Sequence, residues 1–426
     1  MNRTIKKYPI INETLETVIL DNGLTLYLIN KKGFKAYYAS LGVKYGSNNN
    51  SFVPYGESEM ITMPLGIAHF LEHQLFEKED NDASLIFNKY GIESNAYTSF
   101  LETNYYISGT NNLEIGIELL FDFVQNGYFS DDHVQKEKNV IASEIKMYLD
   151  NPGSRIYDGI CNNLFKYDNL KYDIAGTTES IEEINASMLE KAYKTFYQPN
   201  NMYFCLVGDF DNDKIIELIN NNQKKNNSST IEIKTSYPIE PTEINKKYSE
   251  IEMDIAYPKV AIGIKLPGFT KNNPLVQNMF KMILDSKFGY SSKNYQLLLD
   301  KELTNGGFTY STTITPYSSF IKFQCDTDKV EEFIEFMKTE ILSINKDSIT
   351  KERIERCKKN IIGQALKQAN SISSIAVTFM DYIFAGANFF DFLSEFENLQ
   401  YEDFIELFNY FKEENISIFV IKKTKS

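Results

Sequence analysis

The sequence predicts an α+β protein built from two related domains, and three observations lead to this fold class. The chain has 426 residues, more than one hydrophobic core usually serves. A polar stretch rich in Asn, Lys and Ser contains Pro238 and Pro241 and is typical of a domain boundary. After it the order of strands and helices restarts, and both halves end with a helix followed by an apolar strand. We therefore expect an N-terminal domain at 1–222, a linker at 223–246 and a related C-terminal domain at 247–426.

Turn residues and helix-start residues define the elements of the first half. Residues 18–28 alternate around Asp21-Asn22-Gly23, a strong signal for a hairpin turn. A helix is expected to begin near Pro64, because proline suits the first helical turn, and another at Asp131 after Ser130. The other elements predicted here are a strand at 36–45, a loop at 46–56, two short strands within 93–108, helices at 113–125 and 131–150, a strand at 200–209 and a helix at 214–221.

The second half is predicted to repeat this alternation of sheet strands and covering helices. It contains two long helical stretches before a final apolar strand. The predicted elements are strands at 259–266, 308–313, 320–325 and 416–421 and helices at 274–284 and 295–299.

Composition narrows the function classes. The formal net charge of −14 argues against a nucleic-acid binder, which needs basic patches to neutralise phosphates. Residues 1–8 lack the apolar region of a signal peptide, and no window approaches 18 consecutive apolar residues, so no membrane span is expected. The four cysteines are widely spaced and fit no zinc or redox pattern. We expect buried thiols in a reducing, cytoplasmic compartment.

Two of the three histidines in the chain, His69 and His73, are four residues apart with Glu72 between them. On a helix these three side chains share one face with Phe76, while apolar side chains on another face anchor the helix. Two imidazoles in this arrangement can bind one metal ion, and Glu72 then points to its open side, where it can accept a proton from a bound water. A surface or core pair of histidines is the alternative. The third histidine, His133, lies just inside a helix start and is expected to be structural or exposed.

Catalytic zinc commonly takes three protein ligands and one water, so a further ligand must come from elsewhere in the chain. The helix predicted at 131–150 offers Glu137 and Glu144, which lie two turns apart on one face. Glu144 can coordinate the metal while Glu137 supports the site from behind. A solvated acidic face is the alternative reading of this pair. The C-terminal half carries no such metal motif.

The motif His69-Phe70-Leu71-Glu72-His73 is the inverted form of the zincin motif. Together with the preceding Gly66-Ile67-Ala68, it resembles the signature of the pitrilysin/insulinase family of inverted-zinc metallopeptidases. Further segments with the same resemblance are Asn22-Gly23-Leu24, Asn95-Ala96-Tyr97-Thr98 with Thr103 and Tyr105, the segment from Glu137 to Glu144, and Val207-Gly208-Asp209-Phe210.

The resemblance implies a role for each matching residue. His69, His73 and Glu144 would hold one zinc ion per chain, Glu72 would be the general base, and Glu137 would orient the site. Asn95, Ala96, Tyr97 and Thr98 would line an edge strand to which an extended peptide adds. The implied fold is a pair of similar domains, each a mostly antiparallel sheet with helices packed on one face. Such a pair is half of a clamshell.

The chain departs from the family in its second half. Active members supply an Arg and a Tyr that stabilise the developing oxyanion. The Arg would fall at or near Leu299, where this chain has none, whereas Tyr310 stands where the family has its tyrosine. Arg353 and Arg356 belong to a charged helix well downstream. The resemblance is to the zinc-bearing subunit of the bacterial two-chain branch, whose sister subunit supplies Arg and Tyr. A heterodimer is therefore expected, with a homodimer that uses Tyr310 as the alternative.

The predicted function is that of a zinc metalloendopeptidase subunit that hydrolyses short or unfolded peptides, such as leader or precursor peptides. A catalytically silent peptide-binding or structural subunit is the first alternative. Silent members of the family typically lose a motif residue, however, and this chain keeps all four: His69, Glu72, His73 and Glu144. A structural zinc site is the second alternative. It would need a closed shell of four ligands, and no suitably placed cysteine is evident.

Overall fold

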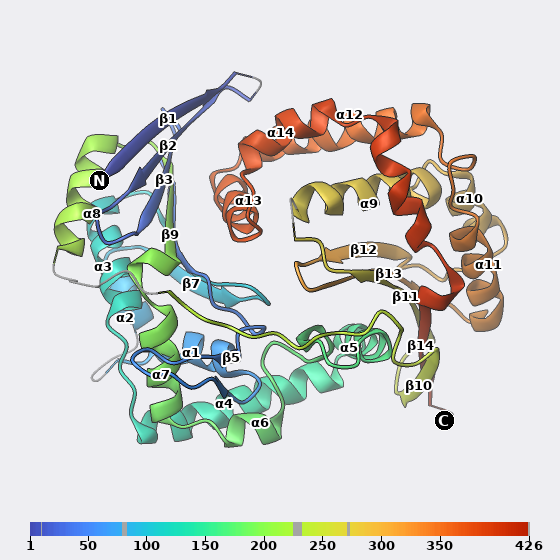
Figure 1. Cartoon of the computed structure of the whole chain (residues 1–426), viewed down its shortest axis with the longest axis horizontal. Coiled ribbons are helices and arrows are strands. Elements are labelled where there is room, and N and C mark those ends of the chain that lie inside the picture. The colour runs from blue at the N-terminus through green and yellow to red at the C-terminus, as the bar shows by residue number, and fades with distance from the viewer. Residues whose placement is uncertain (10, 79–82, 225–231, 271–272, 425–426) are drawn as a thin grey trace. The chain divides into compact units, whose positions relative to one another are not determined.

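The computed structural model describes residues 1–9, 11–78, 83–224, 232–270 and 273–424, and these form two compact units. Unit 1 comprises Met1–Ile145, Asp173–Tyr237 and Leu366–Phe384. Unit 2 comprises Lys146–Tyr172, Pro238–Ala365 and Ala385–Ser426. Each unit has its own sheet with helices packed against it (Figure 1), so the predicted α+β class is confirmed.

The sheet of unit 1 has seven strands in the order β1-β2-β3-β9-β4-β8-β7. All neighbouring strands are antiparallel except β3 and β9, which are parallel. Among the strands that the structure describes, β7 pairs only with β8, and it therefore forms one edge of this sheet. The strands are β1 (Asn2–Tyr8), β2 (Glu13–Ile19), β3 (Thr25–Asn30), β4 (Tyr37–Val43), β7 (Glu93–Thr98), β8 (Thr103–Gly109) and β9 (Met202–Gly208).

Strand β4 lies between β9 and β8 in the sheet of unit 1 and is buried along its whole length. Its odd-numbered residues, from Tyr37 to Val43, join the main core together with α1, α3 and α7. On the opposite face, a Cβ at Gly42 would lie 2.5 Å from the ring of Phe384, so a helix late in the chain packs closely there. The helices of unit 1 are α1 (Ile67–Phe76), α2 (Ala83–Asn88), α3 (Leu113–Gln125), most of α4 (Asp131–Asp150), α6 (Thr178–Glu182), α7 (Ala186–Phe196), α8 (Asn212–Gln223) and α13 (Ile372–Phe384).

The sheet of unit 2 has five strands in the order β10-β14-β11-β13-β12. Its central strand, β11, is also buried on both faces, and a Cβ at Gly263 would lie 2.7 Å from Ile160 of α5. The strands are β10 (Tyr248–Met253), β11 (Lys259–Pro267), β12 (Thr309–Ile314), β13 (Ser318–Asp326) and β14 (Ile416–Lys423). The helices are α5 (Pro152–Leu164), α9 (Asn273–Phe288), α10 (Lys293–Asp300), α11 (Val330–Leu342), most of α12 (Lys351–Gln368) and α14 (Phe389–Asn398).

The predicted relation between the two halves is visible in the strand order. Five strands of unit 1, β3-β9-β4-β8-β7, correspond to β10-β14-β11-β13-β12 of unit 2. In both series the first pair is parallel and the next three pairs are antiparallel. Helix α4 corresponds to α12 in chain order, and their buried residues follow the same intervals. These residues are Val134, Glu137, Lys138, Ile141 and Ile145 in α4, and Ile354, Cys357, Lys358, Ile361 and Ala365 in α12.

The compact units differ from the predicted contiguous domains in two segments. Residues 146–172 precede the predicted linker but pack with unit 2, and residues 366–384 follow it but pack with unit 1. The chain passes from unit 1 to unit 2 between Tyr237 and Pro238, inside the predicted linker; residues 225–231 of that linker lie outside the described residues.

Most predicted elements are present, and the start of α1 is the main correction. The helix begins at Ile67 rather than near Pro64, because Gly66 takes a left-handed conformation with φ of 85°. The predictions omitted strands β1, β5 (Ser51–Phe52), β6 (Ile61–Thr62) and β10 and helices α2, α5, α6 and α7. The two long helical stretches expected before the last strand are four helices, α11 to α14. The cysteines are buried and unpaired, as expected.

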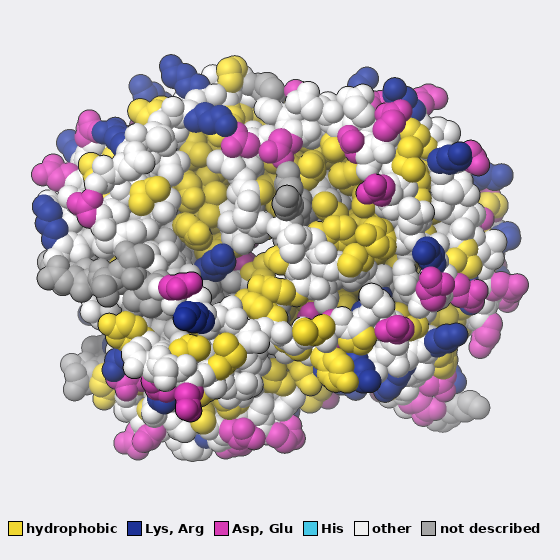
Figure 2. Space-filling view, viewed as in Figure 1, with side chains coloured by type: hydrophobic (Ala, Val, Ile, Leu, Met, Phe, Trp, Pro, Cys, Tyr) yellow, Lys and Arg dark blue, Asp and Glu magenta, His cyan; other side chains and the backbone are white. Residues whose placement is uncertain are grey.

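Among the described residues, no single helix is long and apolar enough to cross a membrane. One pair, Ile372–Phe384 and Phe389–Asn398, passes that test jointly but is bent by 76°. Figure 2 shows Lys and Arg side chains interspersed with Asp and Glu over one face of the molecule.

Candidate metal centre

Close backbone contacts fix the start of helix α1. A Cβ at Gly66 would lie 2.3 Å from the carbonyl oxygen of Ala175, and one at Gly176 would lie 2.6 Å from that of Leu65. Both glycines also have positive φ angles, 85° and 81°. Larger residues would be strained at both positions, so the glycines allow the segment before α6 to hold the helix that carries His69 and His73.

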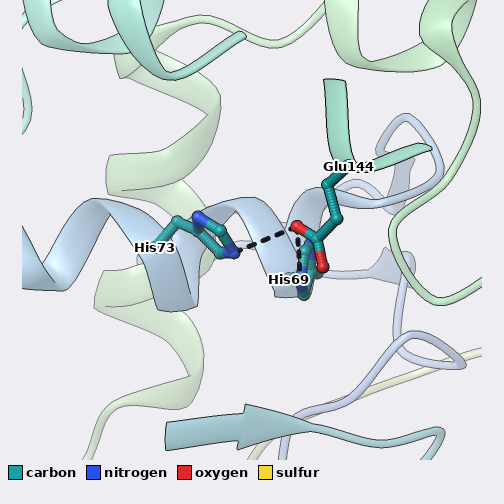
Figure 3. A group of neighbouring side chains, drawn as sticks. All are labelled: His69, His73 and Glu144. Atoms are coloured by element: carbon teal, nitrogen blue, oxygen red, sulfur yellow. Dashed lines mark ion pairs between the residues drawn. The ribbon is translucent and has the colours of Figure 1, made fainter. Parts of the chain in front are cut away.

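His69, His73 and Glu144 form a group of potential metal ligands, because their donor atoms all lie within 4.8 Å of one another. The Glu144 Oε2 atom lies 3.6 Å from Nε2 of His73 and 3.9 Å from Nε2 of His69. Figure 3 shows the Glu144 side chain reaching from its own segment toward both imidazoles on α1. The structure therefore brings together the two histidines and the distant glutamate that the sequence singled out.

Glu137 determines how His73 is oriented. Nδ1 of His73 lies 2.8 Å from Oε1 of Glu137, and an N–H donated there leaves the Nε2 lone pair on the side of Glu144. Burial lowers the pKa of His73, but the hydrogen bond to Glu137 and the charges of Glu72, Glu137 and Glu144 outweigh it, so the net shift is upward.

His69 is the more enclosed of the two histidines. Burial, and then the neighbouring His73, lower its pKa to about 4. It is therefore neutral near pH 7, which is the form that binds a metal. A set of two imidazole nitrogens and one carboxylate matches the three-ligand shell of catalytic zinc sites, so these residues fit that ion.

Glu72 lies on the same helix but does not belong to the ligand group. Its side chain is buried, and Thr98 Oγ1 donates a hydrogen bond of 2.6 Å to its Oε2. Thr98 also lies 3.3 Å from the hydroxyl of Thr103, which donates to the carbonyl of Tyr45. Burial raises the pKa of Glu72 above its usual range. A carboxylate that is fixed, desolvated and close to a metal group is suited to proton transfer.

Strand β7 brings Asn95, Ala96, Tyr97 and Thr98 to the edge of the sheet. Thr98 contacts Glu72, whereas the hydroxyl of Tyr97 donates to Asp381 at 3.3 Å. Asn95 is exposed. The geometry thus joins the general-base candidate directly to the strand predicted to bind peptide.

Two other candidates lie apart from the metal group. His133 is half-buried on α4, and its ring packs against Tyr128 with centroids 5.5 Å apart. Tyr310 lies on β12 in unit 2, where its hydroxyl donates to Oδ1 of Asp285 at 2.7 Å. Leu299, at or near which the family's Arg would fall, is an exposed residue of α10.

A functional candidate that the sequence pattern did not indicate lies near Tyr310. Arg356 on α12 lines the same cavity of unit 2 as Tyr310. Its spacing from Asn360 and Gln364, four and eight residues, was a signal that these side chains share a helix face. The sequence pattern alone indicates only a charged helix at this position.

Comparison with known proteins gives the family. Residues 58–178 match the model for insulinase, peptidase family M16, and residues 183–361 match that for the peptidase M16 inactive domain. The zinc protease YmfH of Bacillus subtilis is 39% identical over 401 residues, which cover 93% of this chain and 94% of that protein. The chain belongs to the insulinase family, M16.

Solved structures agree with this assignment. An M16-like peptidase from Alicyclobacillus acidocaldarius is 28% identical, with a TM-score of 0.91 over 97% of this chain and 99% of that one. The periplasmic protease PqqL of Escherichia coli shares the fold, with 19% identity and a TM-score of 0.75. The match covers 97% of this chain but only 48% of the PqqL chain.

Proposed function

We propose that the chain is the zinc-bearing subunit of an endopeptidase that cuts short or unfolded peptides. The observation that carries this proposal is the convergence of His69, His73 and Glu144 beside Glu72. Relatives named as zinc proteases support the reaction class. One zinc ion per chain and a cytoplasmic location are part of the proposal.

His69, His73 and Glu144 would hold the zinc ion, and Glu137 keeps the His73 ring in the orientation that binding needs. Bound zinc would polarise the attacking water and the scissile carbonyl. Glu72 accepts the proton of the water at Oε1, because Oε2 is engaged by Thr98, and then delivers it to the leaving amine. The exposed edge of β7 would hold the peptide in extended form next to Glu72.

Glu72→Gln tests the role of the general base. The change preserves the shape of the side chain but removes its basicity. Peptide hydrolysis is expected to fall by about 10²-fold or more, while the zinc content, measured by mass spectrometry of the digested protein, stays at the parent level. An unchanged turnover rate with intact zinc would assign the proton transfer to another group.

We further propose that activity needs a related partner that supplies an Arg and a Tyr. The comparison with PqqL supports this proposal, because nearly all of this chain corresponds to only about half of the PqqL chain. The test is to assay hydrolysis by the chain alone, by the chain at rising concentration, and by the chain mixed with a candidate sister subunit. Activity only in the mixture supports a heterodimer. A dependence on the concentration of the single chain, lost in Tyr310→Phe, supports the homodimer, and full activity at all dilutions contradicts both.

A further inference from the structure

Unit 2 contains a cavity of about 630 Å³ on the counterparts of the elements that carry the metal group in unit 1. Helix α9, edge strand β12 and helix α12 line it, and in chain and sheet order these correspond to α1, β7 and α4. On α12, Gln364 occupies the position that Glu144 has on α4, and Cys357 occupies that of Glu137. The same place in the repeated fold therefore has an amide and a thiol instead of two carboxylates.

One wall of this cavity presents unused hydrogen-bond donors. Arg356, Asn360 and Gln364 follow one another at intervals of one helical turn and are exposed. Within the part of the chain that the structure describes, no hydrogen bond or ion pair is assigned to these three side chains. The guanidinium and the two amides are thus free to bind groups that enter the cavity.

The other charges of the cavity compensate each other. On α9, Lys281 forms an ion pair of 2.6 Å with Asp285, which also accepts the hydrogen bond from Tyr310. Asp285 is therefore already neutralised, and the positive charge of Arg356 remains. In a protein with a net charge of −14, this residual charge marks the cavity as a place for a localised anion.

Aromatic rings form the rest of the lining. Phe288, Tyr290, Tyr295 and Phe308 all face the cavity, and Tyr290 is 84% exposed although its ring packs against Tyr295 at a centroid distance of 4.9 Å. An exposed ring beside a polar wall is typical of sites that bind a ligand with one apolar and one polar end.

We propose that this cavity binds the C-terminal end of a peptide, with its carboxylate at Arg356 and an apolar or aromatic last side chain against the rings. A guanidinium matches a carboxylate through two parallel N–H donors. Strand β12 pairs only with β13 among the described strands, so the residues before the peptide end can add along its free edge. A phosphate ion would satisfy Arg356 but not the aromatic wall.

The test measures binding of fluorescent peptides that end in Phe, as the free acid or as the amide, by anisotropy. The metal-free Glu72→Gln chain is used, because it neither cuts the peptide nor offers zinc to its carboxylate. The readout therefore does not depend on the proposed peptidase function. Arg356→Gln removes the cationic donor, and Lys359→Gln, an exposed neighbour on α12 outside the lining, is the control with the same change in charge.

The free acid is expected to bind at least about tenfold more tightly than the amide, and Arg356→Gln should abolish that difference, since charge-assisted hydrogen bonds are the strong ones. Lys359→Gln should retain it. Gln364→Glu should weaken binding of the acid and leave that of the amide unchanged. Three outcomes would each overturn the proposal. The acid and the amide could bind equally well, or Arg356→Gln and Lys359→Gln could weaken binding of the acid to the same extent. Inorganic phosphate could also displace the acid where an excess of a peptide acid ending in Leu does not.

Discussion

The two units place the same kinds of element around two chemically different sites. In unit 1, α1, β7 and α4 bring together two histidines and three glutamates, Glu72, Glu137 and Glu144. In unit 2, α9, β12 and α12 surround an ion pair, an arginine, two amides and several tyrosines. Helices α4 and α12 bury residues at the same intervals, yet Glu137 and Glu144 of the first correspond to Cys357 and Gln364 of the second.

This comparison separates what the fold requires from what the chemistry requires. The apolar positions and the buried lysine of the two helices are kept in both units, because they contact the core and a later helix end. The positions that face the site have changed, both the buried one of Glu137 and Cys357 and the more exposed one of Glu144 and Gln364. The repeated frame therefore provides a site in each unit, and a few side chains determine what that site can bind.

Exchanging the corresponding side chains of α4 and α12 tests this separation and has the largest expected effect. Glu144→Gln gives unit 1 the amide of unit 2 and removes the only carboxylate in the ligand group. Zinc affinity should fall by more than about 100-fold, beyond the loss typical of an outer-shell partner, and hydrolysis should fall with it. Competition with a zinc-binding dye measures the affinity.

The reverse change, Gln364→Glu, is the matched control. It adds a carboxylate to unit 2, but no histidine of the described chain lies on α9 or α12, so the zinc content should stay at the parent level. A second bound zinc, or undiminished affinity in Glu144→Gln, would show that the ligand set is assigned to the wrong residues.

A second contrast lies in the turns that lead out of the two edge strands. Glu102, between β7 and β8, is 8% exposed, and its burial raises its pKa to about 7, with a smaller contribution from Asp381 of α13. The turn between β12 and β13 contains Thr315, Pro316 and Tyr317 and thus no ionisable carboxyl. Only the hairpin of unit 1 has a buried acid at this position.

Because the folded pKa of Glu102 lies above its ordinary value of 4.5, its stabilising contribution is complete below pH 4.5 and is lost as the pH rises through 7. The β7–β8 hairpin should lose up to about 3 kcal/mol over that range, and Glu102→Gln should remove this dependence. Hydrogen exchange of the β8 and β13 amides at pH 5 and pH 8 measures it, with β13 as the internal reference. An identical pH response of β8 in the parent and the variant would contradict the assignment.

Local signals in the sequence were enough to predict much of the fold and the residues that the structure brings together as the candidate metal group. The Asn22-Gly23 turn does separate β2 from β3, and α3 and α4 have the predicted bounds. The spacing of His69 and His73 places both on one face of α1, as the structure has them. These features depend on residues that are close together in the sequence, within one or two helical turns.

Features that depend on distant contacts escaped prediction. Pro64 gave a false helix start, because the left-handed Gly66 next to Ala175 determines where α1 begins. Residues 146–172 and 366–384 pack away from their neighbours in sequence, which no local pattern reveals. The sequence places Arg356 on a charged helix far from Tyr310 along the chain, and only the folded unit brings the two residues to one cavity.

The smallest effect is expected where the units are alike. Lys138 donates from Nζ to the carbonyl of Glu182 at 2.6 Å, and Lys358 donates to that of Leu399 at 2.9 Å. Both lysines are 8% exposed, and both partners lie at the end of a later helix, α6 or α14. Lys138→Met and Lys358→Met keep the length of the side chain but leave a carbonyl without its donor.

Each of these substitutions should destabilise its own unit by about 1 kcal/mol, because the lost hydrogen bond is partly offset by relief from burying a charge. Hydrogen exchange of the slowest amides in β4 and β11 reports on the two units separately, and zinc content should not change in Lys358→Met. If the two substitutions reduce the stability of their units by similar amounts, the lysine is part of the fold that the two units share. If Lys138→Met loses zinc while the β4 amides stay protected from hydrogen exchange, Lys138 instead belongs to the metal site. The similarity between α4 and α12 would then rest on their apolar positions alone.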